Sequence, residues 1–166
     1  MSILTVSSPG MAKWGGRRFR CAIGAAGVSR SKREGDHATP LGCFALRRVL
    51  FRPERVDPPV TALPVAPLEA DDGWCDDPRD DRYNRPVKTS AGARCEALWR
   101  SDAIYDVIVV LGYNDDPVVP GCGSAIFLHR ARPDFAPTEG CIAVALEDLL
   151  AVLEGCEAEA RLCVVD

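Results

Sequence analysis

Hydrophobic residues along this chain occur in short runs, and in several runs apolar and polar residues alternate. Strict alternation places apolar side chains on one face of a β-strand and polar side chains on the other. Residues 18–23 show this pattern, because arginines alternate there with Phe19 and Cys21. Residues 104–112 are almost entirely apolar and rich in β-branched residues, which predicts a central strand buried on both faces. The predicted strands are residues 3–6, 18–23, 43–51, 104–112, 124–129 and 161–165.

Helical spacing replaces this alternation after residue 145. Leucines recur there at intervals of three and four residues, which places them on one face of a helix. Glu147 and Asp148 lie in the first turn, where the helix dipole favours acidic side chains, and Gly155 is expected to end the helix. We expect the leucine stripe to pack into the core rather than to bind a partner. The stripe consists of Leu146, Leu149, Leu150 and Leu153.

The connecting segments are rich in proline, glycine and charged residues, a composition that predicts turns and loops. Residues 53–67 are proline-rich and expected to be extended, whereas the Asp- and Arg-rich residues 70–86 predict a structured loop. We expect residues 95–99 to form a short helical turn. Further loops or turns are predicted at residues 24–36, 39–42 and 118–123.

The length of 166 residues favours one domain, residues 1–166, which is mainly β with one main C-terminal helix. Residues 53–100 are a possible insertion flanking a functional cleft. No apolar run approaches the roughly 18 to 20 residues of a membrane span. The first eight residues lack a basic start, and Pro9-Gly10 interrupts any apolar region, so no signal peptide is expected.

The net charge of −4 gives no electrostatic support for binding nucleic acid or an anionic membrane. Basic residues cluster at positions 13–20 and 30–33. We interpret them as a solvated rim.

Eight cysteines are many for this length, yet there is no CxxC pair and no spacing typical of a zinc site. We therefore expect no metal. Cys21, Cys43 and Cys163 lie in apolar runs and are expected to be small buried core residues. A reducing compartment explains so many thiols most simply, although a disulfide between two of the seven cysteines other than Cys141 stays open.

The segment 125–143 carries the candidate chemistry. His129 ends an apolar strand-like run, and Cys141 follows Glu139-Gly140. A cysteine nucleophile needs a base for its proton and N–H donors for the oxyanion, and this segment offers both. Cys141 and His129 are the predicted nucleophile and base, with the backbone around Gly140 as oxyanion donor.

Three ordered segments make this chain resemble the L,D-transpeptidase catalytic domain, a YkuD-like family of bacterial cell-wall enzymes. Residues 32–42, KREGDHATPLG, are similar to its K-x-x-G-D-x-x-T-P-x-G loop. Residues 124–129, SAIFLH, resemble the strand with the family histidine, and residues 138–142, TEGCI, match Ser/Thr-x-Gly-Cys-hydrophobic. The resemblance implies an L,D-transpeptidase-like β-sandwich or barrel with one main C-terminal helix.

The resemblance also implies residue roles. Cys141 would attack a peptide carbonyl to give a thioester, and His129 would carry the proton. The backbone carbonyl of Arg130 would orient the imidazole. Backbone N–H groups of Glu139, Gly140 and Cys141 would hold the oxyanion. This chain departs from the common pattern at Glu139, often His, and at Ala143, often Arg or Asn, which predicts an altered pocket.

Candidate substrate-binding residues come from three places. Trp74, Tyr83 and Asn84 are expected either to wall the cleft or to hold the long loop together. Arg132 and Arg82 are candidate cations for substrate carboxylates. Thr138 precedes the catalytic turn and is a further candidate. His37 is expected to be a surface-loop residue, and Asp36 and Thr39 are expected to form turns.

The family's substrates are peptidoglycan stem peptides, cut after the L-centre of diaminopimelate and joined to an amine of a second stem. A branch of the family links through the first stem residue. Carbapenem acylation of Cys141 and a periplasmic or cell-envelope location are implied, with no organic cofactor. The lack of a visible signal peptide leaves a cytoplasmic role on turnover fragments open.

Three alternatives remain beside the transpeptidase. The same site could hydrolyse these peptides as an L,D-carboxypeptidase or endopeptidase. The chain could be a non-catalytic peptidoglycan-binding domain, although Cys141, His129 and Gly140 are intact. A thiol redox protein is the weakest alternative, because no CxxC pair is present.

Overall fold

A computed structural model describes residues 2–166 of the chain. It is mainly β with one α-helix, as predicted. The strands are β1 (Ile3–Ser7), β2 (Met11–Trp14), β3 (Arg17–Ala22), β4 (Val28–Ser29), β5 (Thr39–Pro40), β6 (Gly42–Phe51), β7 (Val65–Pro67), β8 (Asp72–Cys75), β9 (Pro86–Lys88), β10 (Cys95–Ala97), β11 (Val107–Leu111), β12 (Phe127–Arg130), β13 (Ile142–Val144) and β14 (Arg161–Val165). The helices are the 3-10 helix η1 (Thr89–Ala91) and α1 (Leu146–Gly155).

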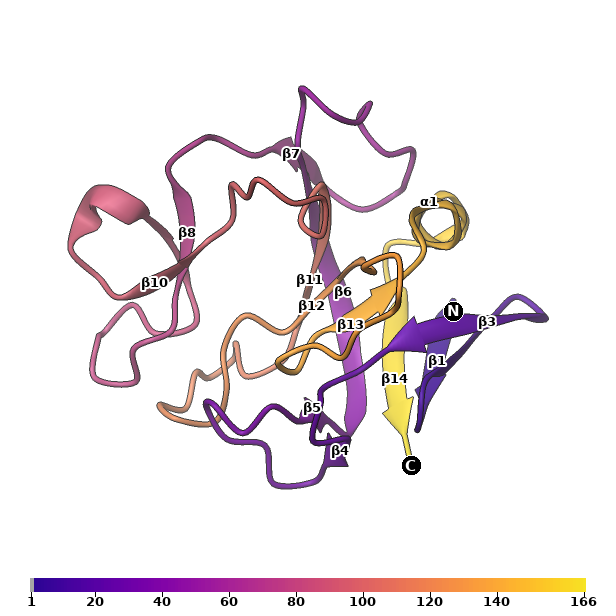
Figure 1. Cartoon of the computed structure of the whole chain (residues 1–166), viewed down its shortest axis with the longest axis horizontal. Helices are drawn as coiled ribbons and strands as arrows, with labels where there is room; N and C mark the ends of the chain where they lie inside the picture. The colour runs from indigo at the N-terminus through magenta and orange to yellow at the C-terminus, as the bar shows by residue number, and fades with distance from the viewer. Residues whose placement is uncertain (1) are drawn as a thin grey trace.

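The large sheet closes on itself. Its strand order is β11-β12-β13-β3-β2-β1-β14-β6-β7, and a further pairing between β6 and β11 joins the ring into a barrel-like sheet. The first and last strands of the chain, β1 and β14, lie side by side in parallel within it (Figure 1). Closure pairs strand edges that would otherwise expose backbone groups.

Strand β11 is buried along its whole length, as its apolar sequence predicted. Val107, Val109 and Leu111 pack into the main core. Ile108 and Val110 point to the opposite face and join a second hydrophobic cluster. Because successive side chains alternate across a strand, a strand apolar at every position needs cover on both faces.

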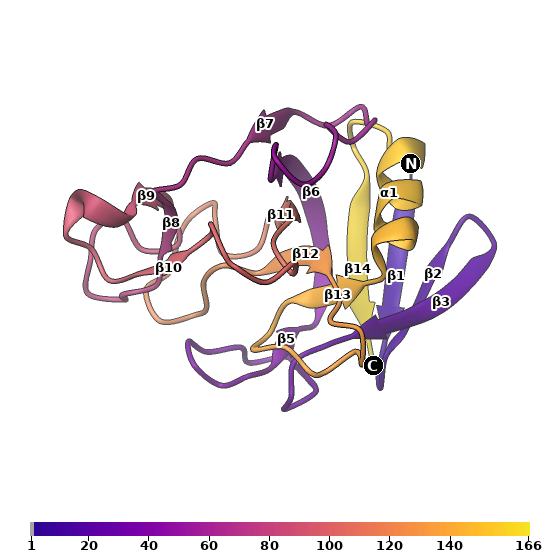
Figure 2. The same ribbon diagram turned by 45° about the horizontal axis from the view of Figure 1, so that its top comes forward.

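The two faces of the sheet are covered by different parts of the chain. Helix α1 covers the main core with Leu149, Val152 and Leu153, which are fully buried. Leu150 was expected in that stripe, but it is exposed, and Val152 occupies the inward position instead. The second cluster includes side chains from the long connection between β7 and β11, and Figure 2 shows β8, β9 and β10 on the far side from α1.

Several predicted element boundaries were wrong. Residues 95–99 were expected to form a helical turn, but Cys95–Ala97 is strand β10, paired with β8. Thr39–Pro40, expected in a turn, pairs with Val28–Ser29. The strand expected at residues 124–129 begins only at Phe127, since Ala125 has a φ of 54° that breaks an extended chain.

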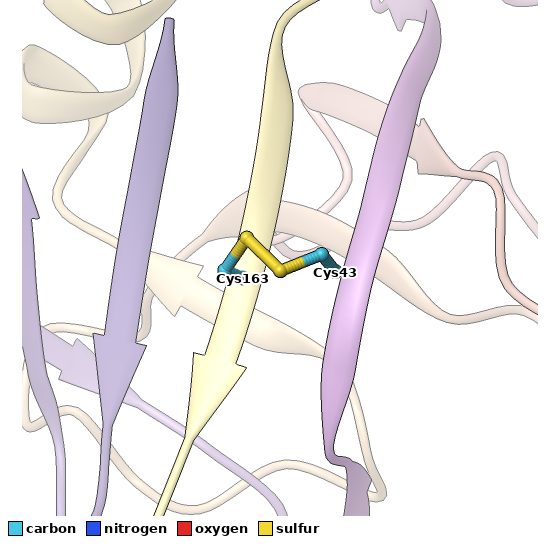
Figure 3. Close-up of a disulfide and its surroundings, with 2 residues drawn as sticks. All are labelled: Cys43 and Cys163. Carbon is cyan, nitrogen blue, oxygen red and sulfur yellow. A yellow bond between two sulfur atoms is a disulfide. The ribbon is translucent and has the colours of Figure 1, made fainter.

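One prediction about the cysteines was also wrong. Cys43 and Cys163 were expected to be small buried core residues. Cys163 is buried, but Cys43 is exposed, and the two form a disulfide between β6 and β14 (Figure 3). The two residues are register partners on antiparallel strands, which brings their side chains together. Cys21 is a buried free thiol, as expected. Residues 2–166 contain no helix long and apolar enough to span a membrane.

We expect the disulfide to contribute about 2–5 kcal/mol to the free energy of unfolding, because it links residues 120 positions apart. Replacing both cysteines by serine should lower the urea midpoint by the same amount as adding reductant to the native protein. Cys122→Ser removes a free thiol and serves as the control. Detection of eight alkylatable thiols in unreduced, unfolded protein would contradict this pairing, which leaves six free cysteines.

Candidate active site

The pairing of β12 with β13 brings the two predicted reactive residues together. These strands run parallel, with Leu128 opposite Ile142 and His129 opposite Ala143. Cys141 directly precedes β13, two positions before Ala143, so alternation directs Cys141 and His129 to the same face. This face is the one with the second hydrophobic cluster, and both residues line one cavity of about 610 Å³.

The Cys141 thiol is held by backbone groups of the strand beside it. Its S–H donates to the carbonyl of Ala125 at 3.1 Å, and its sulfur accepts the N–H of Phe127 at 3.4 Å. The residue is 8% exposed. Burial raises the pKa of the Cys141 thiol to about 12, and the negative charge of Glu96 acts in the same direction. At neutral pH the Cys141 side chain is therefore a neutral thiol.

His129 is oriented by the chain that follows it. Its Nδ1 lies 2.9 Å from the carbonyl oxygen of Arg130. A carbonyl oxygen only accepts, so Nδ1 carries the proton and Nε2 keeps the lone pair. The Tyr105 ring contacts the imidazole edge-on at a centroid distance of 5.2 Å. Burial lowers the pKa of His129 to about 4.

These two shifts describe a neutral resting pair rather than a thiolate–imidazolium pair. Cys141 keeps its proton because its pKa lies far above neutral pH. The His129 imidazole stays neutral, with its one proton on Nδ1, because its pKa lies far below neutral pH. A neutral imidazole with a free lone pair is a competent general base. In the resting site the proton therefore lies on the Cys141 sulfur, and Nε2 of His129 is free to accept one.

The turn before Cys141 is held by two threonines. Thr138 donates its hydroxyl to the carbonyl of Cys141 at 2.6 Å and accepts the N–H of Gly140 at 3.1 Å. Thr39 donates to the carbonyl of Gly140 at 2.9 Å. One of the three N–H groups expected to hold the oxyanion, that of Gly140, is thus already used inside the turn.

Gly140 itself cannot be replaced without strain. Its φ is 142°, a conformation that residues with a side chain rarely adopt. A Cβ atom on it would lie 2.8 Å from the carbonyl oxygen of Ala38, which belongs to the loop before β5. The glycine lets that loop and the catalytic turn pack backbone against backbone.

The cavity wall is strongly charged. Arg100 and Arg132 stand on it as cations, and Arg100 forms a two-pronged ion pair with Asp102. Glu96 lines it as an acid and accepts a hydrogen bond from the Tyr105 hydroxyl. A cavity with fixed charges of both signs suits a ligand with carboxylate and ammonium groups.

The aromatic and amide candidates from residues 70–86 form an internal network. Trp74 Nε1 donates to Asn84 Oδ1 at 2.8 Å, and the same oxygen accepts the N–H of Ala125 at 3.1 Å. The Tyr83 hydroxyl donates to Glu34 at 2.7 Å and accepts the N–H of Gly123 at 3.0 Å. Through Ala125 this network reaches the carbonyl that binds the Cys141 thiol.

The predicted binding residues therefore occupy different places. Trp74, Tyr83 and Asn84 are buried and do not line the cavity. Arg132 lines it, and Thr138 does so as well, although its hydroxyl is used inside the turn. Arg82 is exposed and pairs with Asp80 away from the cavity.

Sequence analysis missed several side chains of the cavity wall, among them Lys32, Glu96, Arg100 and Tyr105. Lys32 belongs to the loop that carries the family resemblance, so its place in the motif was a usable signal. The other three lie on β10 and in the connection to β11. No local pattern marks them, because only the folding of that connection over the sheet brings them to Cys141.

Comparison with known proteins gives a match to one protein family. The sequence model of the YkuD family, described as the L,D-transpeptidase catalytic domain, matches residues 12–161. No curated protein sequence matches the chain. The crystal structure of the helical cell shape determining protein Pgp2 from Campylobacter jejuni superposes with a TM-score of 0.49 and 16% identity, over 99% of this chain and 47% of that one. The chain thus spans about half the length of that protein.

Because the pKa of His129 is lowered in the folded protein, we expect the free energy of unfolding to fall as the solution becomes acidic. The unfolded chain protonates this residue below its ordinary pKa of 6.5, whereas the folded protein resists protonation until about 4. Protons therefore favour the unfolded state, and the free energy of unfolding should fall by about 3 kcal/mol as pH drops from 7 to 4. Urea unfolding at several pH values should show this loss in the native protein. An equal loss in His129→Gln would contradict it.

Replacing Asn84 by alanine should lower the free energy of unfolding by about 2–4 kcal/mol, because buried donors on Trp74 and Ala125 lose their acceptor. Asn84 also has a φ of 56°, which asparagine tolerates better than alanine. Arg82→Ala, on the surface, should have little effect. A stable Asn84→Ala with a raised KM would instead indicate direct substrate contact.

Proposed function

This chain belongs to the L,D-transpeptidase catalytic-domain family, and from that premise we propose that it is a cysteine-dependent acyltransferase acting on peptidoglycan stem peptides. The observation that carries the proposal is the shared cavity of Cys141 and His129, with the imidazole oriented by Arg130. Fold membership alone does not establish an activity, but a nucleophile, a base and an orienting group on one face do support one.

The first half of the reaction forms a thioester. Nε2 of His129 takes the thiol proton as the Cys141 sulfur attacks the peptide carbonyl, and negative charge develops on the carbonyl oxygen. Backbone N–H groups of Glu139 and Cys141 are the candidates to hold that oxyanion. Collapse of the tetrahedral intermediate breaks the C–N bond, and the imidazolium of His129 gives its proton to the leaving amine.

The second half consumes the thioester. An amine of a second stem peptide attacks the thioester carbonyl and loses a proton to His129. The C–S bond breaks, and the Cys141 sulfur recovers its proton from the imidazolium. The product is a new amide, and the enzyme returns to its neutral resting state. Water in place of the amine would give a carboxylic acid instead, so the same site supports an L,D-carboxypeptidase or endopeptidase.

The charged wall supports peptide substrates with free carboxylate and amine groups. We propose that Arg132 and Arg100 bind substrate carboxylates, since both line the cavity beside His129. Stem peptides are part of the cell wall, so this function implies work in the cell envelope. The Cys43–Cys163 disulfide is compatible with an oxidising compartment.

The test is mass spectrometry of purified muropeptides after incubation with the native protein, Cys141→Ala and Cys122→Ala. Native protein and Cys122→Ala should both form cross-linked dimers, whereas Cys141→Ala should lose at least about a thousandfold in rate, because no thioester can form. Trimmed monomers without dimers would make the protein a hydrolase. Equal products from all three proteins would overturn a role for Cys141.

A further inference from the structure

Lys32 is a buried cation that the mechanism so far does not use. Its side chain is 5% exposed, and its ammonium pairs with Asp36 at 2.5 Å. Asp36 is itself fixed by backbone N–H groups of Arg33 and Ala38, and the hydrogen bonds with Lys32 and these amides keep its pKa low despite desolvation. A buried ammonium is costly to desolvate, so it persists only where its partners are well placed.

The ammonium lies against the catalytic turn. A Cβ atom built on Gly140 would lie 3.3 Å from Lys32 Nζ, so the missing side chain leaves room for the ammonium at this point. Gly140 is the residue directly before Cys141, and Lys32 and Cys141 line the same cavity. The aliphatic part of the Lys32 side chain also packs closely against Gly123, where an added Cβ would lie 3.1 Å from Lys32 Cε.

The turn before Cys141 has fewer free backbone N–H donors than the three expected to hold an oxyanion. The Gly140 N–H donates to the hydroxyl of Thr138, which leaves two of the three backbone donors expected for an oxyanion. An ammonium has three N–H donors, and among residues 2–166 Asp36 is the hydrogen-bond partner found for it. Lys32 therefore has donors to spare beside the place where negative charge develops.

The charged and titratable groups that face Cys141 come from every wall of the cavity, and they include acids that oppose a thiolate. Glu96 and Glu139 both raise the pKa of Cys141, whereas Lys32 lowers it. Arginines on the far wall act on His129 instead, where they disfavour the imidazolium. Besides Lys32 and Cys141, the charged and titratable residues that line this cavity are Glu34, His37, Asp76, Glu96, Arg100, Tyr105, His129, Arg132 and Glu139.

We propose that Lys32 supplies the positive charge that stabilises the Cys141 sulfur as it loses its proton and then the oxyanion of the tetrahedral intermediate. This role rests on the acyl-transfer function proposed above. A purely structural ion pair with Asp36 would fix the loop before β5 but would not change the reactivity of Cys141. Asp36 sets the position of the ammonium and is not itself aimed at the sulfur.

Thiol reactivity tests the charge without a substrate. At fixed pH, the rate of Cys141 alkylation by iodoacetamide should fall about tenfold in Lys32→Met, because one pKa unit changes the thiolate fraction tenfold. Lys32→Gln is the second variant in case the first does not fold, and Lys32→Arg should retain most of the rate. Lys88→Met removes an exposed lysine away from the cavity and should react like the native protein.

Turnover on stem peptides tests the oxyanion. Lys32→Met should lower kcat by about 10- to 1,000-fold with KM changed less than about threefold, as expected for loss of transition-state stabilisation. Native rates of alkylation and turnover in a folded Lys32→Met or Lys32→Gln would overturn the proposal. If the native protein shows no turnover, the acyl-transfer function fails, whereas the alkylation comparison still decides whether Lys32 acts on Cys141.

Discussion

Parallel pairing between β12 and β13 is the constraint on which the site depends. Strand β13 has only three residues, yet it is bonded to β12 on one side and to β3 on the other. This pairing sets the register that directs His129 and Cys141 to one face, while Leu128 and Ile142 anchor the opposite face in the main core. A shift of β13 by one residue would turn Cys141 to the opposite face, toward the main core and away from His129.

The face of the sheet that carries Cys141 and His129 owes its chemical environment to the connection between β7 and β11, which covers it. Side chains from the connection between β7 and β11 bury Cys141 and His129, and burial is what keeps both neutral at rest. The same connection is bonded to the segment just before β12, because the side chain of Asn84 accepts the N–H of Ala125. Positioning of the thiol and exclusion of water are therefore two results of one packing event.

Much of the fold was predictable because long patterns carry their own signal. The apolar run of β11 predicted burial on both faces, which the structure confirms, and the helical spacing predicted α1 correctly with Leu149 and Leu153 on its buried face. Short elements were missed because their state is decided by a partner strand rather than by their own residues. Cys95–Ala97 extends because β8 lies beside it, and Ile142–Val144 because two strands flank it.

The residues of the candidate site likewise divide into those that a sequence pattern marks and those that only tertiary packing places there. Cys141 and His129 were predicted because the chemistry demands those residue types near a glycine turn, and the family motif fixed their places. Glu96 and Tyr105 come from a segment without such a motif, and their position follows from tertiary packing alone. The Cys43–Cys163 disulfide was likewise set by register, which apolar runs do not reveal.

The order of strands also governs when this protein can fold during its synthesis. Strand β14 lies between β1 and β6, so the ring has a gap until residues 161–165 have emerged from the ribosome. A chain stalled before that point exposes the edges of β1 and β6, which were synthesised more than 100 residues earlier. Cys141 is thus translated before the sheet that supports it can close, and the ring that positions it is complete only when β14 has been made.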